Sequence, residues 1–288
     1  MSHGLAPALA PLAEAGLGAP LALARPLGGG DICAAYWVQS AEGQEAFLKG
    51  LSRAPEGFFE AEAAGLRALA EVPGAPPVPR VIAARREGLL LEHLPPGQSG
   101  PEAWRRFGRQ LAQLHRQGHG AFGAPADNFI GRTPQDNRWC ESGAEFYATR
   151  RLGPQLERAA RAGLLEGRLL RDLEALTGRL AELLPREAPP ALIHGDLWRG
   201  NAYSGPEGAI FLIDPAAHYG HREAELAMTH LFGPFPRPFY EGYDEAWPLL
   251  PGAKARRGLY NLYHLLNHLN LFGPSYRSSV EATLAPYL

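Results

Sequence analysis

The 288-residue chain has few cysteines, little net charge and no long apolar run, and each shortage excludes a class of protein. Two cysteines, Cys33 and Cys140, cannot form the disulfide framework of a small secreted domain, which favours a reducing compartment. A net charge of −2 indicates no basic surface for nucleic acid or for an anionic membrane. No apolar run approaches the roughly 18 residues of a transmembrane helix, and the first residues lack the basic start of a secretory signal, although residues 5–23 are rich in Ala and Leu. We therefore expect a cytoplasmic protein with no nucleic-acid or membrane partner.

Lysine is also scarce, and its position is informative. Lys and Arg total 28, but only Lys49 and Lys254 are lysines. Lys49 lies within the apolar, strand-like segment 46–50, where its ammonium group would be a compact point charge suited to a phosphate. The alternative is a lysine at a strand end that reaches solvent. The ten histidines show no metal-ligand spacing, and no Ser-His-Asp or Cys-His arrangement can be assembled from the sequence.

The most informative segment is residues 192–201, Leu-Ile-His-Gly-Asp-Leu-Trp-Arg-Gly-Asn, which a short hairpin connects to Asp214. Asn201 lies five residues after Asp196, which is the Asp-to-Asn spacing of the protein-kinase catalytic loop. Phosphoryl transfer requires a carboxylate that orients the attacking hydroxyl and oxygen ligands that fix Mg²⁺ on the ATP phosphates. We therefore predict Asp196 as the catalytic base and Asn201 and Asp214 as metal ligands. His194 is expected to hold the loop by hydrogen bonds rather than to act as a base.

The segments before residue 51 predict a small sheet that covers ATP. Residues 5–24 are predicted to be helical, and a strand, three glycines and a second strand over residues 34–38 follow. Because glycine has no side chain, Gly28, Gly29 and Gly30 would let the backbone approach the ATP phosphates closely. The pattern matches neither G-x-G-x-x-G nor a Walker loop, so a flexible hairpin is the alternative.

An amphipathic helix is predicted over residues 56–71. Its apolar residues recur with a period close to that of a helix, and they are Phe58, Phe59, Ala63, Leu66, Leu69 and Ala70. Glu62 lies on this helix thirteen residues after Lys49, where a kinase has the glutamate that pairs with the strand lysine. Glu60 is the competing candidate, and either carboxylate could instead be a solvated helix charge.

A hinge is predicted where the apolar strand 88–94 runs into a Pro-Pro-Gly sequence. A shorter strand over residues 80–84 precedes it. Backbone groups of Glu92, His93 and Leu94 could hydrogen-bond to adenine at this point. The boundary between two domains is therefore predicted here.

Beyond the hinge the chain is predicted to be mainly helical, with helices over residues 101–117 and within residues 146–184. The apolar residues on one face of the first helix are Trp104, Phe107, Leu111 and Leu114. These features predict an α+β, protein-kinase-like fold with two lobes. Residues 1–92 would form a small N-terminal antiparallel sheet plus a helix. Residues 93–288 would form a larger, mainly helical C-terminal lobe with the catalytic loop, the metal site and the substrate pocket.

Several further segments carry a specific resemblance that covers nearly the whole chain. They are residues 59–66, 111–116, 127–137, 151–156, 194–198, 213–223 and 262–273. Together they resemble the fructosamine kinase (ketosamine-3-kinase) family, and the Trp after Gly-Asp-Leu and the C-terminal segment distinguish it from aminoglycoside kinases. The resemblance implies ATP-dependent phosphorylation of the 3-hydroxyl of a sugar attached to an amine. The phosphate is then eliminated and the amine is freed, which repairs a glycated protein.

The resemblance implies a small-molecule or protein-bound ketosamine as substrate, with ATP and Mg²⁺ as cofactors, and we expect a monomer or a weak dimer. It also leads us to expect a preference for ketosamines shorter than fructosamines. An aminoglycoside- or choline-type phosphotransferase is the alternative enzyme, and an ATP-binding pseudokinase is the non-enzyme alternative. Pseudokinases usually lack the strand Lys, the catalytic Asp or the metal Asp, and this chain has a candidate for each.

Candidates for the sugar pocket lie beside the catalytic loop and in the C-terminal helical segment. Trp198 could stack on a sugar ring or pack in the core. His264 and Asn267 share one face of a predicted helix, where they could line the pocket or anchor helix packing.

Three residues depart from the pattern of the family. Arg199 stands where a small residue commonly follows the Trp, and Gly143 stands where Trp is expected. Glu225 replaces an Asp that is expected to brace the catalytic loop. None of the predicted catalytic or metal-binding positions is affected.

Overall fold

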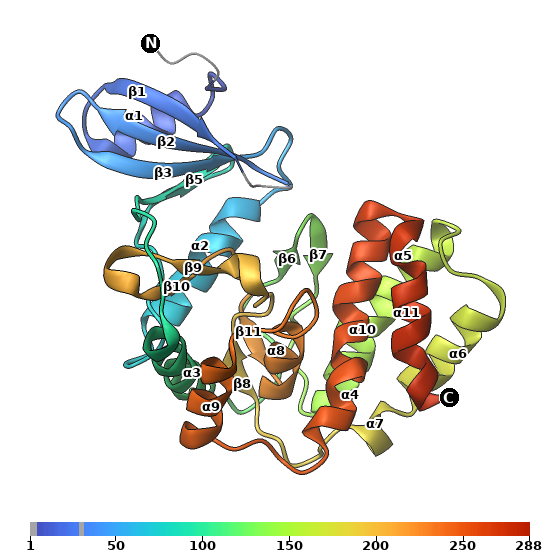
Figure 1. The fold of residues 1–288 in the computed structure, drawn as a ribbon. Helices are drawn as coiled ribbons and strands as arrows, with labels where there is room; N and C mark the ends of the chain where they lie inside the picture. The colour runs from blue at the N-terminus through green and yellow to red at the C-terminus, as the bar shows by residue number, and fades with distance from the viewer. Residues whose placement is uncertain (1–4, 29–31) are drawn as a thin grey trace.

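The N-terminal part of the protein is an antiparallel β-sheet. The structure is a computed structural model that describes residues 5–28 and 32–288, so Gly29 and Gly30 of the predicted glycine turn lie outside the described residues. The strands are β1 (Leu21–Leu27), β2 (Ala34–Ser40), β3 (Glu45–Gly50), β4 (Val81–Arg85) and β5 (Gly88–Glu92). Their order in the sheet is β1-β2-β3-β5-β4, and Figure 1 labels the first four.

A helix packs on each face of this sheet. These helices are α1 (Ala10–Leu17) and α2 (Phe58–Ala70). Because successive side chains of a strand point to opposite faces, Leu90 of β5 packs in the core with α1, whereas Leu89 and Leu91 pack in the core with α2. The sheet is thus apolar on both faces, and its β3 and β5 strands are buried.

The predicted helix over residues 5–24 is wrong in its length. Gly18 adopts a left-handed backbone with φ of 71° and ends α1. Leu21 then begins β1, which pairs along its length with β2. Pairing in the sheet therefore overrides the high helix propensity of the Ala- and Leu-rich sequence. The predicted helix over residues 56–71 is confirmed, as α2.

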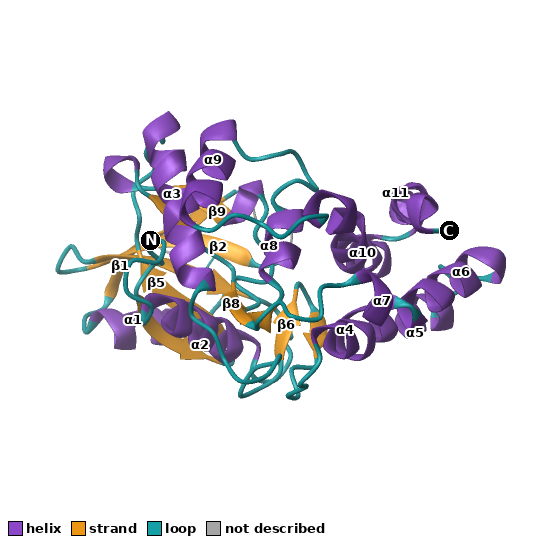
Figure 2. Cartoon of the chain, turned by 90° about the horizontal axis from the view of Figure 1, so that it is seen from below, coloured by secondary structure: helices purple, strands orange, loops and turns teal. Residues whose placement is uncertain are grey.

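The C-terminal part is mainly helical (Figure 2). Its helices are α3 (Pro101–His115), α4 (Gly143–Phe146), α5 (Gly153–Arg161), α6 (Gly167–Gly178), α7 (Leu180–Leu183), α8 (Arg222–Met228), α9 (Arg237–Ala246), α10 (Ala253–Phe272) and α11 (Arg277–Leu284). A π-helical segment, η1 (Tyr147–Leu152), joins α4 to α5, and a short turn, η4 (Pro274–Tyr276), joins α10 to α11. The strand pairs are β6 (Asn128–Ile130) with β7 (Thr133–Gln135), β8 (Ala191–Ile193) with β11 (His218–Gly220), and β9 (Ala202–Ser204) with β10 (Ile210–Leu212).

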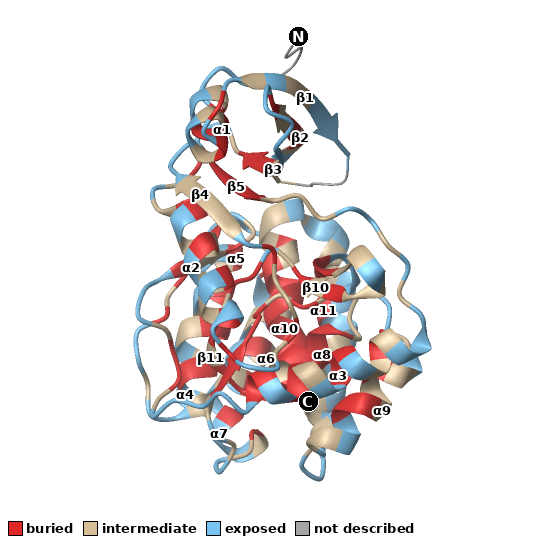
Figure 3. Cartoon of the chain, turned by 90° about the vertical axis from the view of Figure 1, so that its left-hand side faces the viewer, coloured by how far each residue is buried: buried red, intermediate tan, exposed pale blue. Residues whose placement is uncertain are grey.

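Two apolar cores support these elements (Figure 3). One lies among α5, α6, α10 and α11, and the other joins α3 and α9 to β8, β9 and β10. The predicted apolar face of α3 is buried in the second core. Two glycines allow α3 and α9 to touch, because a Cβ atom at Gly108 or at Gly242 would lie 2.0 Å from a carbonyl oxygen of the facing helix.

The chain passes from the sheet to the helical part directly after β5. The N–H of Gly97 donates to the carbonyl of Ser204 at 2.8 Å, which holds this connection against β9. The lobe boundary between residues 92 and 93 stays a prediction. Within residues 5–28 and 32–288, no helix is long and apolar enough to cross a membrane.

Candidate active site

Lys49 links the sheet to the segment that follows β10. Its Nζ lies 2.9 and 3.0 Å from the two carboxylate oxygens of Glu62 on α2 and 2.7 Å from Oδ1 of Asp214. Glu60, the competing candidate, is exposed. Burial alone would lower the pKa of Lys49, but Asp214 and Glu62 outweigh burial and raise that pKa. The lysine is therefore charged at neutral pH.

Asp214 is presented on a sharp turn immediately after β10. Its φ of 57° lies in the left-handed region, which Asp tolerates better than most residues with a side chain. The side chain keeps 47% of its surface exposed, and one of its carboxylate oxygens contacts Lys49. The turn thus leaves part of an anionic group open beside the charged lysine.

Asp196 follows strand β8 in the loop between β8 and β9. Asn201 fixes this loop, because its Nδ2 donates to the carbonyl oxygen of Asp196 at 2.8 Å and lies 3.4 Å from the carboxylate oxygen Oδ2. The carboxylate retains 23% exposure. Burial raises the pKa of Asp196 well above its ordinary value, and the negative charges of Asp214 and Glu225 act in the same direction.

His194 is a structural support of the loop. Its Nε2 donates to the carbonyl of Ile213 at 2.8 Å, and its Nδ1 accepts from the N–H of Asp196 at 3.2 Å. Burial lowers the pKa of this histidine, so the imidazole is neutral at pH 7. Both ring nitrogens are engaged, as the sequence predicted, and neither is available as a base.

Glu225 on α8 holds the backbone directly before Asp196. Its Oε1 accepts from the N–H of His194 at 2.6 Å, and its Oε2 accepts from the N–H of Gly195 at 2.9 Å. His115 of α3 lies 3.4 Å from the same carboxylate. Glu225 therefore occupies the bracing position that the family pattern assigns to an Asp.

The other two departures also have a structural reason. A Cβ atom at Gly143 would lie 2.2 Å from Nε2 of His221, so the histidine fills the space that a side chain at position 143 would need. The guanidinium of Arg199 lies 4.5 Å above the ring of Trp104. This stacking on α3 fixes the direction of the arginine side chain.

The residues predicted to bind the nucleotide differ in whether their backbone groups already make hydrogen bonds within the protein. Gly28 has open space where a side chain would stand. At the hinge, the N–H of Glu92 donates to the carbonyl of Arg80, and the carbonyl of Leu94 accepts from the hydroxyl of Tyr203. The backbone of His93 makes no hydrogen bond to the described residues. Adenine binding at the hinge stays a prediction, and it would use His93 or the N–H of Leu94 rather than the N–H of Glu92.

The three predicted sugar-pocket residues have different surroundings. Nδ1 of His264 lies 3.7 Å from Oδ1 of Asp196 and, among the described residues, has no hydrogen-bond partner. Trp198 is half-buried, and its ring packs edge-on against Phe232. Asn267 is buried, and its Oδ1 accepts from Gln155 of α5, which supports helix packing rather than substrate contact.

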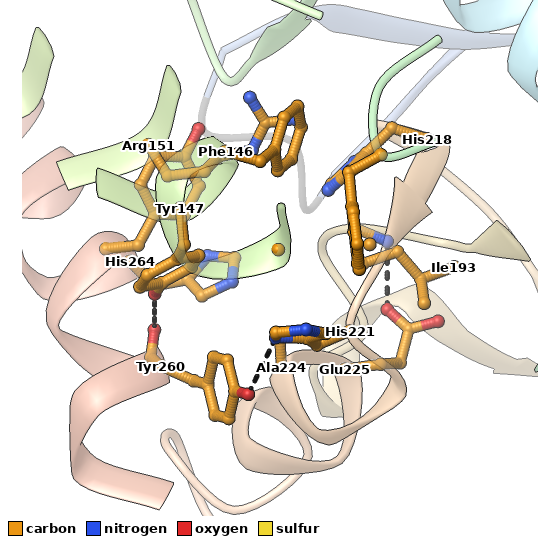
Figure 4. A pocket seen from close by; sticks show the side chains of 15 residues that line it. Phe146, Tyr147, Arg151, Ile193, His218, His221, Ala224, Glu225, Tyr260 and His264 are labelled. Atoms are coloured by element: carbon orange, nitrogen blue, oxygen red, sulfur yellow. Dashed lines mark hydrogen bonds between the residues drawn. The ribbon is translucent and has the colours of Figure 1, made fainter. Parts of the chain in front are cut away.

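A small cavity lies beneath the catalytic loop (Figure 4). Its volume is about 20 Å³, which is room for one water molecule. His264 lines it from α10 and His221 lines it from the start of α8, and the hydroxyl of Tyr260 is 2.9 Å from Nδ1 of His221. Burial lowers the pKa of His264 to about 3 and that of His221 to about 4, so both rings are neutral at pH 7.

Motif spacing predicted no role for the polar residues of the β6–β7 hairpin, which entered only as part of the family resemblance. Asn128 and Gln135 of the β6–β7 hairpin are buried and hydrogen-bonded to each other at 2.7 Å. Gln135 also accepts from the hydroxyl of Tyr263 on α10 at 2.6 Å, and Asn128 donates to the carbonyl of Ala217 at 3.0 Å. Arg151 extends this network by donating to Asn137 at 2.7 Å. The network ties the hairpin to α10 and to the segment that follows Asp214.

A family model described as fructosamine kinase matches residues 11–288. The chain belongs to the fructosamine kinase family. A protein from Synechocystis named "Probable ketoamine kinase" is 43% identical over 268 residues, covering 90% of this chain and 88% of that protein. A "Protein-ribulosamine 3-kinase, chloroplastic" from Oryza sativa subsp. indica is 37% identical over 276 residues, covering 91% of this chain and 78% of that protein.

The solved structures agree with this membership. The crystal structure of a protein assigned as a fructosamine-3-kinase from Thermobifida fusca has a TM-score of 0.89 at 39% identity, and the match covers 96% of this chain and 97% of the other. Antibiotic phosphotransferases below 25% identity share the fold alone. The predicted α+β, protein-kinase-like fold is therefore confirmed, with its antiparallel N-terminal sheet and its helical C-terminal part.

Proposed function

We propose that this member of the fructosamine kinase family is an ATP- and Mg²⁺-dependent kinase that phosphorylates the 3-hydroxyl of a ketosamine. The observation that carries the proposal is the convergence of Lys49, Asp196 and Asp214 from three separate segments of the chain. Lys49 contacts Asp214, and the ring of His194 bonds both the N–H of Asp196 and the carbonyl of the residue before Asp214. The names of the relatives, ketoamine kinase and ribulosamine 3-kinase, support a ketosamine as the acceptor.

Asp196 is the proposed catalytic base. The hydrogen bonds from Asn201 fix its position, and its 23% exposure leaves the carboxylate accessible to an acceptor hydroxyl. A carboxylate whose pKa is raised by burial is a stronger proton acceptor than an exposed one. Asp196 would thus orient the 3-hydroxyl and take its proton as the phosphoryl group is transferred.

Asn201 and Asp214 form a donor set that fits Mg²⁺. The amide nitrogen of Asn201 is committed to Asp196, so the oxygen of the same amide remains as a ligand. Asp214 adds a carboxylate that is 47% exposed. One or two protein oxygens together with nucleotide phosphates are the usual ligands of Mg²⁺ in kinases. When bound, the ion neutralises charge on the ATP phosphates.

Lys49, aligned by Glu62, is the proposed phosphate-binding cation, and the turn predicted at Gly28, Gly29 and Gly30 is proposed to cover the phosphates. The contact between Lys49 and Asp214 supports this, because it shows that the lysine reaches the proposed metal ligand. All three groups that pseudokinases usually lack have candidates in this site, which favours an enzyme over an ATP-binding scaffold.

The test of the proposal is the variant Asp196→Asn. We expect it to lower kcat for a ketosamine by about 10²–10⁴, while Mg·ATP binds with nearly unchanged affinity. Asp244→Asn on α9, an exposed aspartate that forms no ion pair with the described residues, is the control and should keep full activity. Near wild-type kcat in Asp196→Asn would refute the assignment.

The sugar is tested with ketosamines of different length. We propose that ribulose- or erythrulose-lysine is preferred over fructose-lysine, and kcat/KM for the three substrates measures this directly. A preference for fructose-lysine of tenfold or more would refute the short-sugar proposal. Phosphorylation of an aminoglycoside or choline in place of all three would refute the ketosamine reaction itself.

The cellular setting of the enzyme is also a proposal. Cys33 and Cys140 are both free, which supports a reducing, cytoplasmic compartment. We propose a monomer or weak dimer, and light scattering at micromolar concentration tests that state.

A further inference from the structure

A stripe of side chains extends along α10 from the catalytic aspartate to the end of the helix. His264, His268 and Phe272 follow one another at intervals of four residues, so they share one helix face. His264 contacts Asp196, and its residue is 6% exposed, whereas Phe272 is 47% exposed. Eight residues of helix span about 12 Å. The stripe therefore begins at the reacting position and ends at the surface.

Aromatic rings broaden the outer half of this stripe. The ring of Phe232 lies 4.7 Å from that of His268 and 6.1 Å from that of Trp198. Tyr276 of η4 lies 5.1 Å from His268 and 6.2 Å from Phe272. We call Phe232, Phe272 and Tyr276 the aromatic ledge. Phe272 is among the few large apolar side chains that are exposed in the described residues. Together with the half-buried Phe232 and Tyr276 it forms a continuous apolar surface, and such a surface commonly marks a contact site.

The end of α10, which carries Phe272, lies on the side of the helical part that faces the N-terminal sheet (Figure 1). In Figure 1, α10 rises toward that sheet and ends beside the β6–β7 hairpin. A Cβ atom at Gly131 of this hairpin would lie 2.9 Å from Leu271 and 3.1 Å from Ile32. The end of α10 is thus next to the β6–β7 hairpin and to Ile32, and Phe232 of the ledge adjoins Trp198 of the catalytic loop.

The length of the stripe matches the length of a lysine-linked ketosamine. Nine bonds separate the 3-hydroxyl oxygen of the sugar from the Cα of a lysine that carries it on its ε-nitrogen. With bonds of about 1.5 Å and tetrahedral angles, this chain extends to roughly 11 Å. When the 3-hydroxyl is at Asp196, the polypeptide backbone would therefore lie at Phe272.

We propose that the aromatic ledge binds the polypeptide segment that carries the glycated lysine, so that Phe272 contributes to kcat/KM for a peptide-bound ketosamine but not for the adduct of a small amine. This inference rests on the proposed ketosamine kinase function. Phenylalanine and tyrosine rings offer large, rigid apolar faces with low conformational entropy cost, and these suit a backbone with varied side chains.

The test compares one sugar on two amines. Ribulosamine is prepared on methylamine, which is too short to reach the ledge, and on the lysine of an Ala-rich heptapeptide. For Phe272→Ala, kcat/KM for the peptide adduct should fall about tenfold, the size of a partly buried aromatic contact. For the methylamine adduct it should change less than twofold, which also shows that the variant is folded. Leu250→Ala, which removes an exposed apolar side chain near the other end of α10, should change neither value.

Three outcomes would overturn the proposal. Equal losses on both adducts would place Phe272 in the sugar site or the catalytic loop. No loss on either would show that the aromatic ledge does not bind the carrier. A change of oligomeric state in Phe272→Ala without a change in substrate preference would show that a second copy of the chain covers the ledge. If wild-type enzyme phosphorylates neither adduct but does phosphorylate an aminoglycoside or choline, the proposed function fails as well, which distinguishes the two failures.

Discussion

The hydrogen bonds between Glu225 and the catalytic loop predict that Glu225→Gln will lower both the stability and the activity of the protein. The carboxylate accepts two backbone hydrogen bonds, at 2.6 Å from the N–H of His194 and at 2.9 Å from the N–H of Gly195. An amide offers one oxygen and one NH₂ group, so one of the two N–H groups would face another donor. A hydrogen bond to a charged group contributes about 1.5–3 kcal/mol, and a buried unpaired donor costs about 1–3 kcal/mol. We expect the free energy of unfolding to fall by about 2–4 kcal/mol.

The same change should lower catalysis. The bonded backbone directly precedes Asp196, and a shift of about 1 Å at a reacting group can cost about 10²-fold in rate. We therefore expect kcat to fall at least tenfold, while the affinity for Mg·ATP, whose proposed ligands Asn201 and Asp214 are not bonded to Glu225, stays within about twofold. Urea unfolding followed by tryptophan fluorescence gives the stability, and steady-state kinetics gives kcat.

Glu223→Gln is a matched control on the same helix. Glu223 is buried and pairs with Arg256 at 2.6 and 2.7 Å, but it does not contact the catalytic loop. It should lose stability with little loss of kcat. A Glu225→Gln variant that retains kcat within twofold of wild type, or equal losses of kcat in both variants, would contradict the bracing role of Glu225.

Three further predictions concern metal, packing and pH. Asp214→Ala should lose Mg²⁺-dependent ATP binding, and unchanged heats in isothermal titration would contradict its role. Gly143→Ala should be destabilised by about 1–3 kcal/mol, because its Cβ would lie 2.2 Å from His221; a melting temperature equal to wild type would contradict the close contact. Burial, followed by the charge of Arg256, lowers the pKa of His221 from 6.5 to about 4, so the unfolded state binds more protons below pH 6.5. Its contribution to stability is complete above pH 6.5 and decreases by about 2 kcal/mol between pH 7 and 5, and His221→Asn should show a shallower pH dependence in urea unfolding.

Local spacing predicted the parts of the site that lie close together in the sequence. The loop of Asp196 and Asn201 and the pairing of Lys49 with Glu62 follow from offsets of five and thirteen residues. The first offset lies within one loop, and the second runs from one strand to the helix that follows it. The sequence could therefore indicate them without knowledge of the rest of the fold.

Spacing in the sequence could not predict contacts between residues that are far apart in the chain. Tyr263 and Gln135 are separated by 128 residues, and Asn267 and Gln155 by 112 residues. Which polar side chain is a ligand and which is a buried structural partner depends on such contacts, so Asn267 could equally be either. The helix predicted over residues 5–24 failed for a related reason, because the partner strand β2 decides the conformation of β1.

The distribution of lysine has a consequence for an enzyme of this family, because a sugar forms a ketosamine only with a free amine. Lys49 is buried and its pKa is raised by Asp214 and Glu62, so its nitrogen is both shielded and protonated. Lys254 is exposed, and it is the only other lysine in the sequence. The remaining 26 of the 28 basic side chains are guanidinium groups, which do not form ketosamines. The chain thus offers a reactive sugar a single exposed lysine side chain.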